Sequence, residues 1–288
     1  MTKPAQWVAG ARPRTLPAAV VPVLVGSAVA AADGRVIWWR SVVALVVSLA
    51  LQVGVNYAND YSDGIRGTDA GRVGPVRLVA GGLVEPRKVK HAAWLSFCVA
   101  AIAGLALALA TSPWLILVGA VSVAAAWFYT GGPRPYGYAG FGELFVFVFF
   151  GLVAVAGTAY VSLGRVPHLA ILAAVPVGLL SVSLLVVNNL RDIPSDTLAR
   201  KRTLAVRLGA GATRLLYAGC LIGAFALAIV IATERRLAIV AVTSVVMAVG
   251  PARIVLGGAT GRRLVVVLAM TGRLVLVFGV LLAVGIAW

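Results

Sequence analysis

Long apolar segments alternate with shorter polar ones along the 288-residue sequence. A helix needs about 20 consecutive apolar residues to cross the hydrocarbon core of a bilayer. We therefore expect an all-α integral membrane protein, a bundle of nine transmembrane helices that forms a single domain over residues 1–288. The predicted spans are residues 16–33, 39–58, 91–110, 113–130, 141–163, 168–190, 214–232, 237–256 and 264–286.

The positions of the basic residues predict how this bundle is oriented. If the N-terminus is cytoplasmic, 19 of the 25 Lys and Arg residues fall in the inner segments and five fall in the outer ones. The remaining one, Arg273, lies within the last predicted span. Because cytoplasmic loops carry an excess of Lys and Arg, the sequence predicts a cytoplasmic N-terminus and a C-terminus outside.

Composition supports a membrane protein over a nucleic-acid-binding one. The chain is 61% hydrophobic and 12% charged, whereas soluble domains carry about 25% charged residues. A net charge of +16 would suggest a nucleic acid partner in a soluble protein. Here the basic residues are explained by topology, so we expect no nucleic acid partner and a multi-pass location in the plasma membrane. Cys98 and Cys220 lie within apolar segments, where we expect them to pack.

Two of the predicted inner segments, residues 59–90 and 191–213, are long and hold five of the six Asp residues. Each begins at an acidic motif, NYANDYSD over residues 56–63 and NNLRDIPSD over residues 188–196. Residues three and four apart share one face of a helix. We therefore expect two sets of side chains that each point one way: Asn56, Asp60 and Asp63 in the first motif, and Asn188, Asp192 and Asp196 in the second.

Four interpretations of the acidic motifs compete. They could cap helix ends, but two matched motifs, each followed by several basic residues, make this less probable than for one motif alone. They could relay ions in an ion-coupled transporter, which would place them near the middle of the membrane rather than at span ends. A scaffold with charged loops would not need Asp at helical spacing. Finally, they could hold Mg²⁺, which is usually bound by one or two carboxylates plus substrate phosphates.

The fourth interpretation suits a diphosphate whose apolar tail lies in the lipid. The basic residues that follow both motifs would neutralise its charge. The sequence contains no GxxxxGK[ST] segment, so a nucleotide-binding P-loop is not supported.

The whole chain resembles the UbiA superfamily of intramembrane prenyltransferases, whose members carry two Asp-rich motifs on a bundle of nine helices. The resemblance rests on WVAGARPRTLPAAVVPVLVG (7–26), NDYSDGIRGTD followed by RVGPVR (59–77), YTGGPRPYGYAGFGELFVFVFFG (129–151) and NNLRDIPSD followed by KRTLAVRLG (188–209). Within the superfamily the chain is most similar to the members that act on 1,4-dihydroxy-2-naphthoate. This implies transfer of a polyprenyl group from an all-trans polyprenyl diphosphate, with loss of CO₂ and diphosphate, to give demethylmenaquinol for menaquinone biosynthesis.

The resemblance also implies roles for individual residues. Two Mg²⁺ ions would bridge the diphosphate, held by Asn56, Asp60, Asp63, Asn188, Asp192 and Asp196. The expected catalytic residues are Asp60, Asp63, Asp192, Asp196 and Lys201. The expected substrate-binding residues are Asn56, Asn59, Arg66, Asp69, Arg72, Arg77, Tyr129, Arg134, Tyr136, Asn188, Arg202 and Arg207. Family members often have Gly before the Lys, where this sequence has Arg200.

Departure of the diphosphate would leave an allylic cation, and aromatic faces can stabilise such a cation. The candidates are Tyr57, Tyr61, Tyr129, Phe145 and Phe149, which could equally belong to the interfacial belt or to helix packing. Polyprenyl diphosphate, 1,4-dihydroxy-2-naphthoate and the lipid bilayer are the expected partners, with the active site on the cytoplasmic side. The alternative within the family is an enzyme for another aromatic acceptor, such as 4-hydroxybenzoate.

Overall fold

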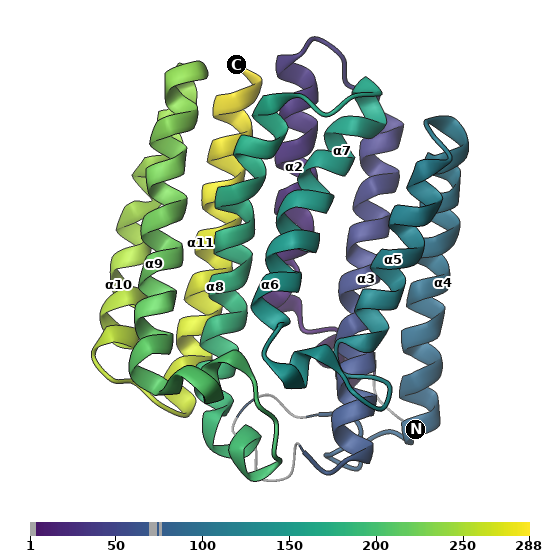
Figure 1. Ribbon diagram of the computed structural model, residues 1–288, viewed down its shortest axis with the longest axis vertical. Helices are drawn as coiled ribbons and strands as arrows, with labels where there is room; N and C mark the ends of the chain where they lie inside the picture. The colour runs from purple at the N-terminus through teal and green to yellow at the C-terminus, as the bar shows by residue number, and fades with distance from the viewer. Residues whose placement is uncertain (1–3, 69–73, 75–76) are drawn as a thin grey trace.

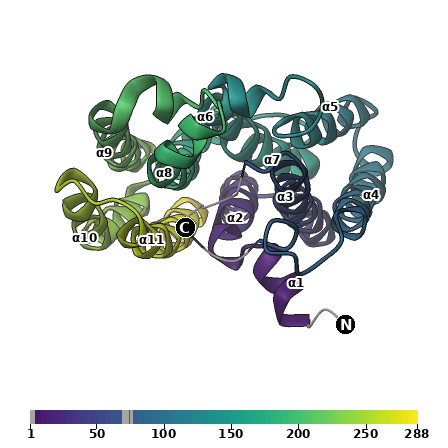
Figure 2. The ribbon, with the colours of Figure 1, turned by 90° about the horizontal axis from the view of Figure 1, so that it is seen from below.

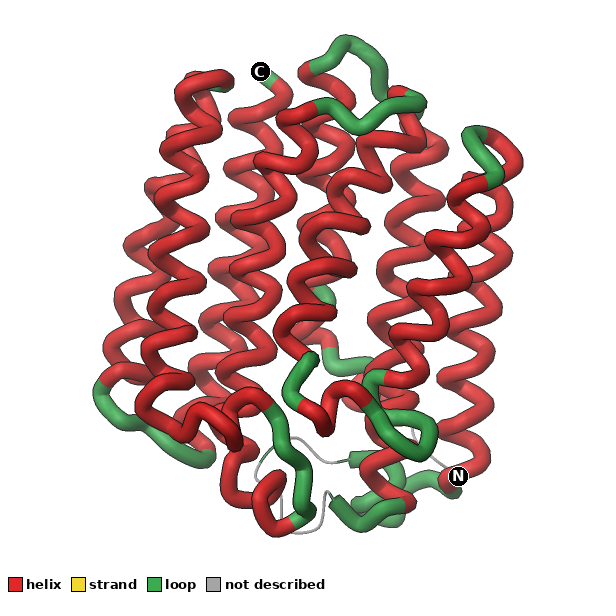
Figure 3. The backbone as a smooth tube through the Cα atoms, in the orientation of Figure 1, coloured by secondary structure: helices red, strands yellow, loops and turns green. Residues whose placement is uncertain are grey.

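The computed structural model describes residues 4–68, 74 and 77–288, and over these residues it is a helical bundle without strands (Figures 1 and 3). The predicted all-α fold is therefore confirmed for the described residues. The elements are α1 (Pro4–Gly10), η1 (Pro13–Thr15), α2 (Pro17–Ala32), α3 (Trp38–Ile65), α4 (Pro86–Ala110), α5 (Trp114–Phe128), η2 (Tyr136–Ala139), α6 (Gly142–Val146), the π-helix η3 (Phe147–Val153), α7 (Ala154–Leu163), α8 (His168–Leu198), α9 (Leu204–Glu234), η4 (Arg236–Ser244), α10 (Val245–Leu256) and α11 (Arg262–Ala287).

Fewer of these helices meet the length for a membrane span than the sequence predicts. Seven are long and apolar enough, or eight if α1–η1 and α2, which meet at a bend of 53°, count as one broken span. Every predicted span corresponds to a helix, but α5 has only 15 residues. At 1.5 Å per residue it rises about 22 Å, less than the roughly 30 Å of the hydrocarbon core. The prediction of nine spans is therefore confirmed only as a bundle with seven or eight candidate spans.

The two acidic motifs lie on helices that continue beyond the predicted spans. The pattern predicts spans that end at residues 58 and 190, whereas α3 ends at Ile65 and α8 at Leu198. We call this end of the bundle, at the bottom of Figure 1, the motif end. Seen from it, α9 and α10 lie on one side of the bundle and α4 and α5 on the other (Figure 2).

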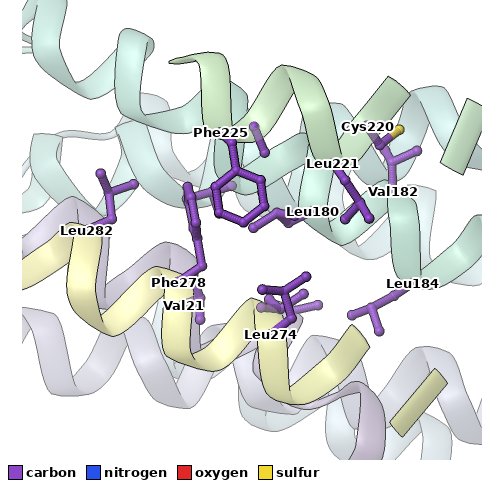
Figure 4. Close-up of a cluster of buried hydrophobic side chains, with 14 of the residues drawn as sticks. Val21, Leu180, Val182, Leu184, Cys220, Leu221, Phe225, Leu274, Phe278 and Leu282 are labelled. Atoms are coloured by element: carbon purple, nitrogen blue, oxygen red, sulfur yellow. The ribbon is translucent and has the colours of Figure 1, made fainter. Parts of the chain in front are cut away.

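The main core lies where α2, α8, α9 and α11 meet (Figure 4). Phe225 and Phe278 contact edge to face there, with ring centroids 5.5 Å apart. Close packing through small residues is what holds helices together in lipid, and α11 uses glycine in this way. A Cβ atom on Gly279 would lie 2.2 Å from Val21, so only glycine permits this approach of α11 to α2.

At the end opposite the motif end, one guanidinium connects three helices. Arg40, in the first turn of α3, donates hydrogen bonds to the carbonyl oxygens of Val161 in α7 (2.6 Å) and Ala110 in α4 (2.7 Å). These carbonyls lie at the C-terminal ends of their helices, where a cation is favoured by the helix dipole. Arg40 therefore holds α3, α4 and α7 together at this end.

Candidate active site at the motif end of the bundle

The first acidic motif contributes two side chains that face the interior of the bundle. The Oδ1 atom of Asn59 accepts a hydrogen bond from the hydroxyl of Thr130 (2.8 Å). The Oδ1 atom of Asp63 accepts hydrogen bonds from the ammonium of Lys201 (2.9 Å) and from the hydroxyl of Tyr138. The end of α3 is thus linked to the loop after α5 and to the end of α8.

Asp60 faces elsewhere. Its two carboxylate oxygens accept hydrogen bonds from the backbone N–H groups of Leu78 and Val79, each at 2.9 Å, and the residue is 1% exposed. The prediction that Asn56, Asp60 and Asp63 point the same way is therefore wrong for Asp60. Asp60 lies about 60° around the helix from Asp63. It contacts the chain that returns from the first long loop, while Asp63 contacts Lys201 after α8.

In the second motif, Arg191 holds the first carboxylate. Its guanidinium donates to both oxygens of Asp192, at 2.7 and 2.8 Å, and to the Oδ1 atom of Asn188 at 2.6 Å. Arg191 is buried (5% exposed), and a two-point contact of this kind is strong and fixes the geometry. Next to it, the amide of Asn189 donates to the buried carboxylate of Glu143 (2.9 Å). The second motif is therefore held by partners from α8 itself and from α6.

Lys201 lies between the two motifs because the chain turns sharply at the end of α8. Arg200 has a left-handed backbone (φ 57°), and the N–H of Lys201 donates to the carbonyl of Asp196 (2.8 Å). This is the turn that usually has glycine after a helix end, and here Arg200 adopts it. As a result the Lys201 ammonium also lies 3.9 Å from the Oδ1 atom of Asp196.

Tyr138 supports this arrangement from the loop between α5 and α6. Its ring lies 4.6 Å from the Lys201 ammonium, within the range of a cation–π contact. Burial, and then the neighbouring charge of Asp63, raise the pKa of Tyr138 well above its ordinary value. The hydroxyl therefore stays protonated at neutral pH and donates to Asp63.

These side chains surround a small polar pocket that adjoins a large apolar cavity. The polar pocket measures about 50 Å³ and is lined by Asn59, Asp63, Arg77, Asn188, Asp192, Asp196 and Lys201, together with Arg12, Tyr129, Thr130, Gly137, Tyr138, Asn189 and Thr203. The cavity measures about 980 Å³, and its walls are mostly apolar side chains of α2 to α8. Four residues line both spaces: Arg12, Asn59, Tyr129 and Asn188.

The structure brings most of the predicted site residues together, but not all. Asn56 and Tyr136 line the apolar cavity, and the Nδ2 atom of Asn56 donates to the carbonyl of Ala11 (2.8 Å). Asp69 and Arg72 lie outside the described residues. The predicted residues that line neither space are Asp60, Arg66, Arg134, Arg202 and Arg207.

Three of these outlying arginines have structural contacts instead, among them Arg207, whose Nε atom donates to the carbonyl of Arg202 (3.1 Å). Arg66 donates to the carbonyl oxygens of Thr130 and Gly132 (2.5 Å to the latter), and so holds the loop that carries Tyr138. The backbone N–H of Arg202 donates to the carbonyl of Tyr138 (2.9 Å). The sequence interpretation missed Tyr138, Thr130 and Asn189. Their proximity in sequence to Arg134 and Asn188 is the only signal that could have indicated them.

Some of the predicted aromatic residues line the apolar cavity and others do not. Tyr129, Phe145 and Phe149 line the apolar cavity, and the ring of Tyr136 stacks on Phe145 with centroids 3.9 Å apart. Tyr57 and Tyr61 do not line it: Tyr57 donates to the carbonyl of Trp7 (2.9 Å), and Tyr61 stacks on Trp127. Aromatic faces therefore lie along the cavity beside the polar pocket.

The donor atoms around the polar pocket fit Mg²⁺ in kind. Carboxylates and amide oxygens are the ligands that this cation prefers, and it commonly uses one or two carboxylates and completes its shell with water and phosphate. Within the described ranges, no three His, Cys, Asp or Glu side chains are grouped closely enough to hold a metal by themselves. Asp63, Asp192 and Asp196 instead contact Lys201 or Arg191. The pocket therefore suits a cation that arrives with phosphate oxygens.

The protein is a helical membrane bundle, and its apolar cavity adjoins a small pocket lined by carboxylates and an ammonium. This arrangement is typical of proteins that bind a ligand with an anionic head and an apolar tail. Residues 19–263 match the UbiA prenyltransferase family, and the chain belongs to this family.

Relatives and solved structures agree with that assignment. A protein of Mycobacterium tuberculosis named 1,4-dihydroxy-2-naphthoate octaprenyltransferase is 53% identical over 99% of this chain and 97% of its own length. A protein of Escherichia coli with the same name is 37% identical over 75% of this chain and 73% of its own. The fold resembles a UbiA homologue from Archaeoglobus fulgidus bound to GPP and Mg²⁺, with a TM-score of 0.69 at 13% identity over 96% of this chain and 99% of that one. A UbiA homologue from Aeropyrum pernix K1 gives 0.70 at 16% identity over 92% and 97%.

Proposed function

We propose that this protein is a Mg²⁺-dependent polyprenyltransferase that acts on 1,4-dihydroxy-2-naphthoate. It transfers a polyprenyl group from an all-trans polyprenyl diphosphate, releases CO₂ and diphosphate, and forms demethylmenaquinol for menaquinone biosynthesis. The observation that carries this proposal is the junction at which the apolar cavity meets the polar pocket, lined by Arg12, Asn59, Tyr129 and Asn188. The name of the 53% identical relative supports the choice of acceptor.

The shape of the two spaces supports the following proposal for how the donor binds. Its apolar tail occupies the cavity, and its diphosphate occupies the polar pocket, where Lys201 and Arg77 line the wall. The bond between the first tail carbon and the diphosphate oxygen therefore lies at the junction. Binding energy from the whole tail holds that bond in place, which is how remote contacts contribute to catalysis.

The proposed metal residues are the members of the two motifs that line the pocket, so Asn59 takes the place of the predicted Asn56. Asp63, Asp192 and Asp196, with Asn59 and Asn188, would hold Mg²⁺ against the diphosphate. When bound, Mg²⁺ supplies positive charge that stabilises the departing diphosphate. Two ions, as the two motifs suggest, are part of the proposal. Asp60 is the weakest candidate ligand, since both of its oxygens accept backbone hydrogen bonds.

The protein's own side chains then determine the course of the reaction. The C–O bond breaks, its electron pair leaves with the diphosphate, and Lys201 and Arg77 face the added negative charge. The allylic cation that remains faces Tyr129, Phe145 and Phe149, whose rings stabilise it without reacting. The electron-rich ring of the acceptor attacks the cation. A new C–C bond forms, and loss of the carboxylate as CO₂ restores aromaticity.

We also propose the finer topology that the charge distribution predicts. α5 is then a ninth, short span, the N-terminus is cytoplasmic and the C-terminus lies outside. The opposite placement of α1 and of the end of α11 supports an odd number of crossings (Figure 1). The active site at the motif end then faces the cytoplasm from the plasma membrane.

Acceptor labelled with ¹⁴C in its carboxyl group tests the reaction. Label that leaves as CO₂ in step with diphosphate supports the proposal. Retention of the label in the lipid product would instead assign the protein to the family members that keep the carboxylate, such as those that prenylate 4-hydroxybenzoate.

A further inference from the structure

The ammonium of Lys201 lies between the two acidic motifs, in the position that a bridging cation would take. It is 2.9 Å from Asp63 on α3 and 3.9 Å from Asp196 on α8. All three side chains are buried, with 8%, 8% and 10% of their side-chain surface exposed. A buried charge is stable only when it is paired, and Lys201 provides the partner for both carboxylates.

This position is fixed by several contacts that do not depend on a ligand. The left-handed turn at Arg200 and the hydrogen bond from the Lys201 N–H to the Asp196 carbonyl set the backbone. The Tyr138 ring lies 4.6 Å from the ammonium, and the Tyr138 hydroxyl donates to the same Asp63 oxygen. These contacts fix the backbone of Lys201 and orient its side chain toward both carboxylates when no ligand is bound.

A divalent cation that approaches Asp63 meets this ammonium first. Two cations cannot share one carboxylate oxygen at contact distance without strong repulsion in a site of low dielectric constant. A metal at the Oδ1 atom of Asp63 would displace the ammonium, and a metal at the Oδ2 atom would still be repelled by it. A diphosphate in the same pocket offers the ammonium a new anionic partner. Binding of the metal and binding of the diphosphate thus help each other, which is a positive coupling between two ligands.

We propose that Lys201 is a placeholder for the divalent cation. Without ligand it neutralises Asp63 and Asp196; with ligand it moves to the diphosphate and leaves the carboxylates to the metal. This inference rests on the proposed function. Its consequence is that the protein binds the metal poorly by itself and binds it well together with a prenyl diphosphate.

Binding of Mn²⁺ to the purified full-length protein, followed by loss of the electron paramagnetic resonance signal of free Mn²⁺, tests this without any turnover. In the absence of donor, Lys201→Met should bind Mn²⁺ at least tenfold more tightly than the wild type, because the competing ammonium is gone. Lys201→Arg keeps the charge and should stay within about threefold of the wild type. Lys201→Gln replaces Lys201→Met if the latter does not fold. The matched control is Lys88→Met, the same substitution at an exposed lysine that pairs with Glu85, and it should bind Mn²⁺ as the wild type does.

A second titration adds geranyl thiodiphosphate, a slowly reacting donor analogue. The wild type should then bind Mn²⁺ at least tenfold more tightly than without the analogue, and Lys201→Met should gain much less. Unchanged or weaker Mn²⁺ binding by folded Lys201→Met and Lys201→Gln without donor would overturn the placeholder role. Equal gains in the wild type and in Lys201→Met would also overturn it, whereas no gain in either protein would count against the proposed function itself.

Discussion

The two acidic motifs, at the ends of α3 and α8, each have an Asn four residues before an Asp, yet their first carboxylates have different partners. Asp60 accepts hydrogen bonds from the backbone N–H groups of Leu78 and Val79. Asp192, its counterpart by spacing, accepts from the side chain of Arg191. A side chain can rotate away from a carboxylate, whereas backbone N–H groups move only if the loop moves. Asp192 can therefore change partners when a ligand binds, and Asp60 cannot do so without releasing its loop.

The second carboxylates of the motifs are more alike. Asp63 and Asp196 both contact Lys201 and both line the polar pocket. Asp63, Asp192 and Asp196 thus contact side chains that can move away, whereas Asp60 holds the backbone of the returning loop. Substitutions at each position test this division.

The largest effect is expected at the shared pair. Asp63→Ala and Asp196→Ala should each reduce kcat by about a thousandfold or more, because a metal clamp contributes several kcal/mol of transition-state stabilisation and about 1.4 kcal/mol corresponds to a factor of ten. Initial rates of lipid product formation at saturating donor measure this. Glu234→Ala, which removes a half-exposed carboxylate, is the control and should be silent. Near-normal rates in both Asp variants would remove these residues from the mechanism.

The next effect separates Asp60 from its neighbours. Asp60→Ala leaves two backbone N–H groups without their carboxylate, at about 1–3 kcal/mol for each unsatisfied group, so stability should fall and activity with it. The Mg²⁺ concentration that gives half-maximal rate should nevertheless stay the same. Asp60→Asn, which keeps one acceptor, should show a smaller loss. A rise of tenfold or more in the half-saturating Mg²⁺ concentration, matching Asp63→Asn, would show that Asp60 is a metal ligand after all.

A smaller effect concerns the support behind the second motif. Glu143→Ala leaves the buried amide of Asn189 without its acceptor and should lower the free energy of unfolding by about 1–3 kcal/mol. Glu143→Gln retains an acceptor oxygen and should lose less. Thermal unfolding in detergent measures both. Glu85→Ala is a suitable control, since the Glu85 side chain is 70% exposed and pairs only with Lys88 among the contacts described for it. Equal stability of Glu143→Ala and Glu85→Ala would mean that Asn189 needs no such support.

The smallest effect is expected at the turn before Lys201. A left-handed residue other than glycine costs about 1–2 kcal/mol, while glycine loses more entropy on folding, by roughly 0.5–1 kcal/mol. Arg200→Gly should therefore change the free energy of unfolding by no more than about 1 kcal/mol and should keep the activity. A large loss of activity would show that the Arg200 side chain has a role of its own.

The hydrophobic pattern predicted the helices well, because long apolar segments leave few alternatives in a bilayer. It placed the end of the sixth predicted span too early, at residue 190, since the polar residues and Pro194 that follow are typical of a loop. The helix, α8, nevertheless continues to Leu198. The site was predicted in part. Helical spacing predicted that Asp192 and Asp196 share a face, and the structure places both beside Asp63 in one pocket. It could not foresee that Leu78 and Val79 return to Asp60, because that contact joins residues 18 and 19 positions apart through a loop.

Arg40, at the end opposite the active site, matters for whether protons can cross the membrane through the protein. Val161, whose carbonyl accepts from Arg40, also lines the far end of the cavity with Ala44 and Leu107. A continuous hydrated path along the polar pocket and the cavity would let protons leak and would dissipate the membrane potential. Apolar walls and a fixed positive charge are the barriers that membrane channels use to exclude protons. The guanidinium of Arg40 and these apolar side chains should therefore let the protein process lipids without making the membrane permeable to protons.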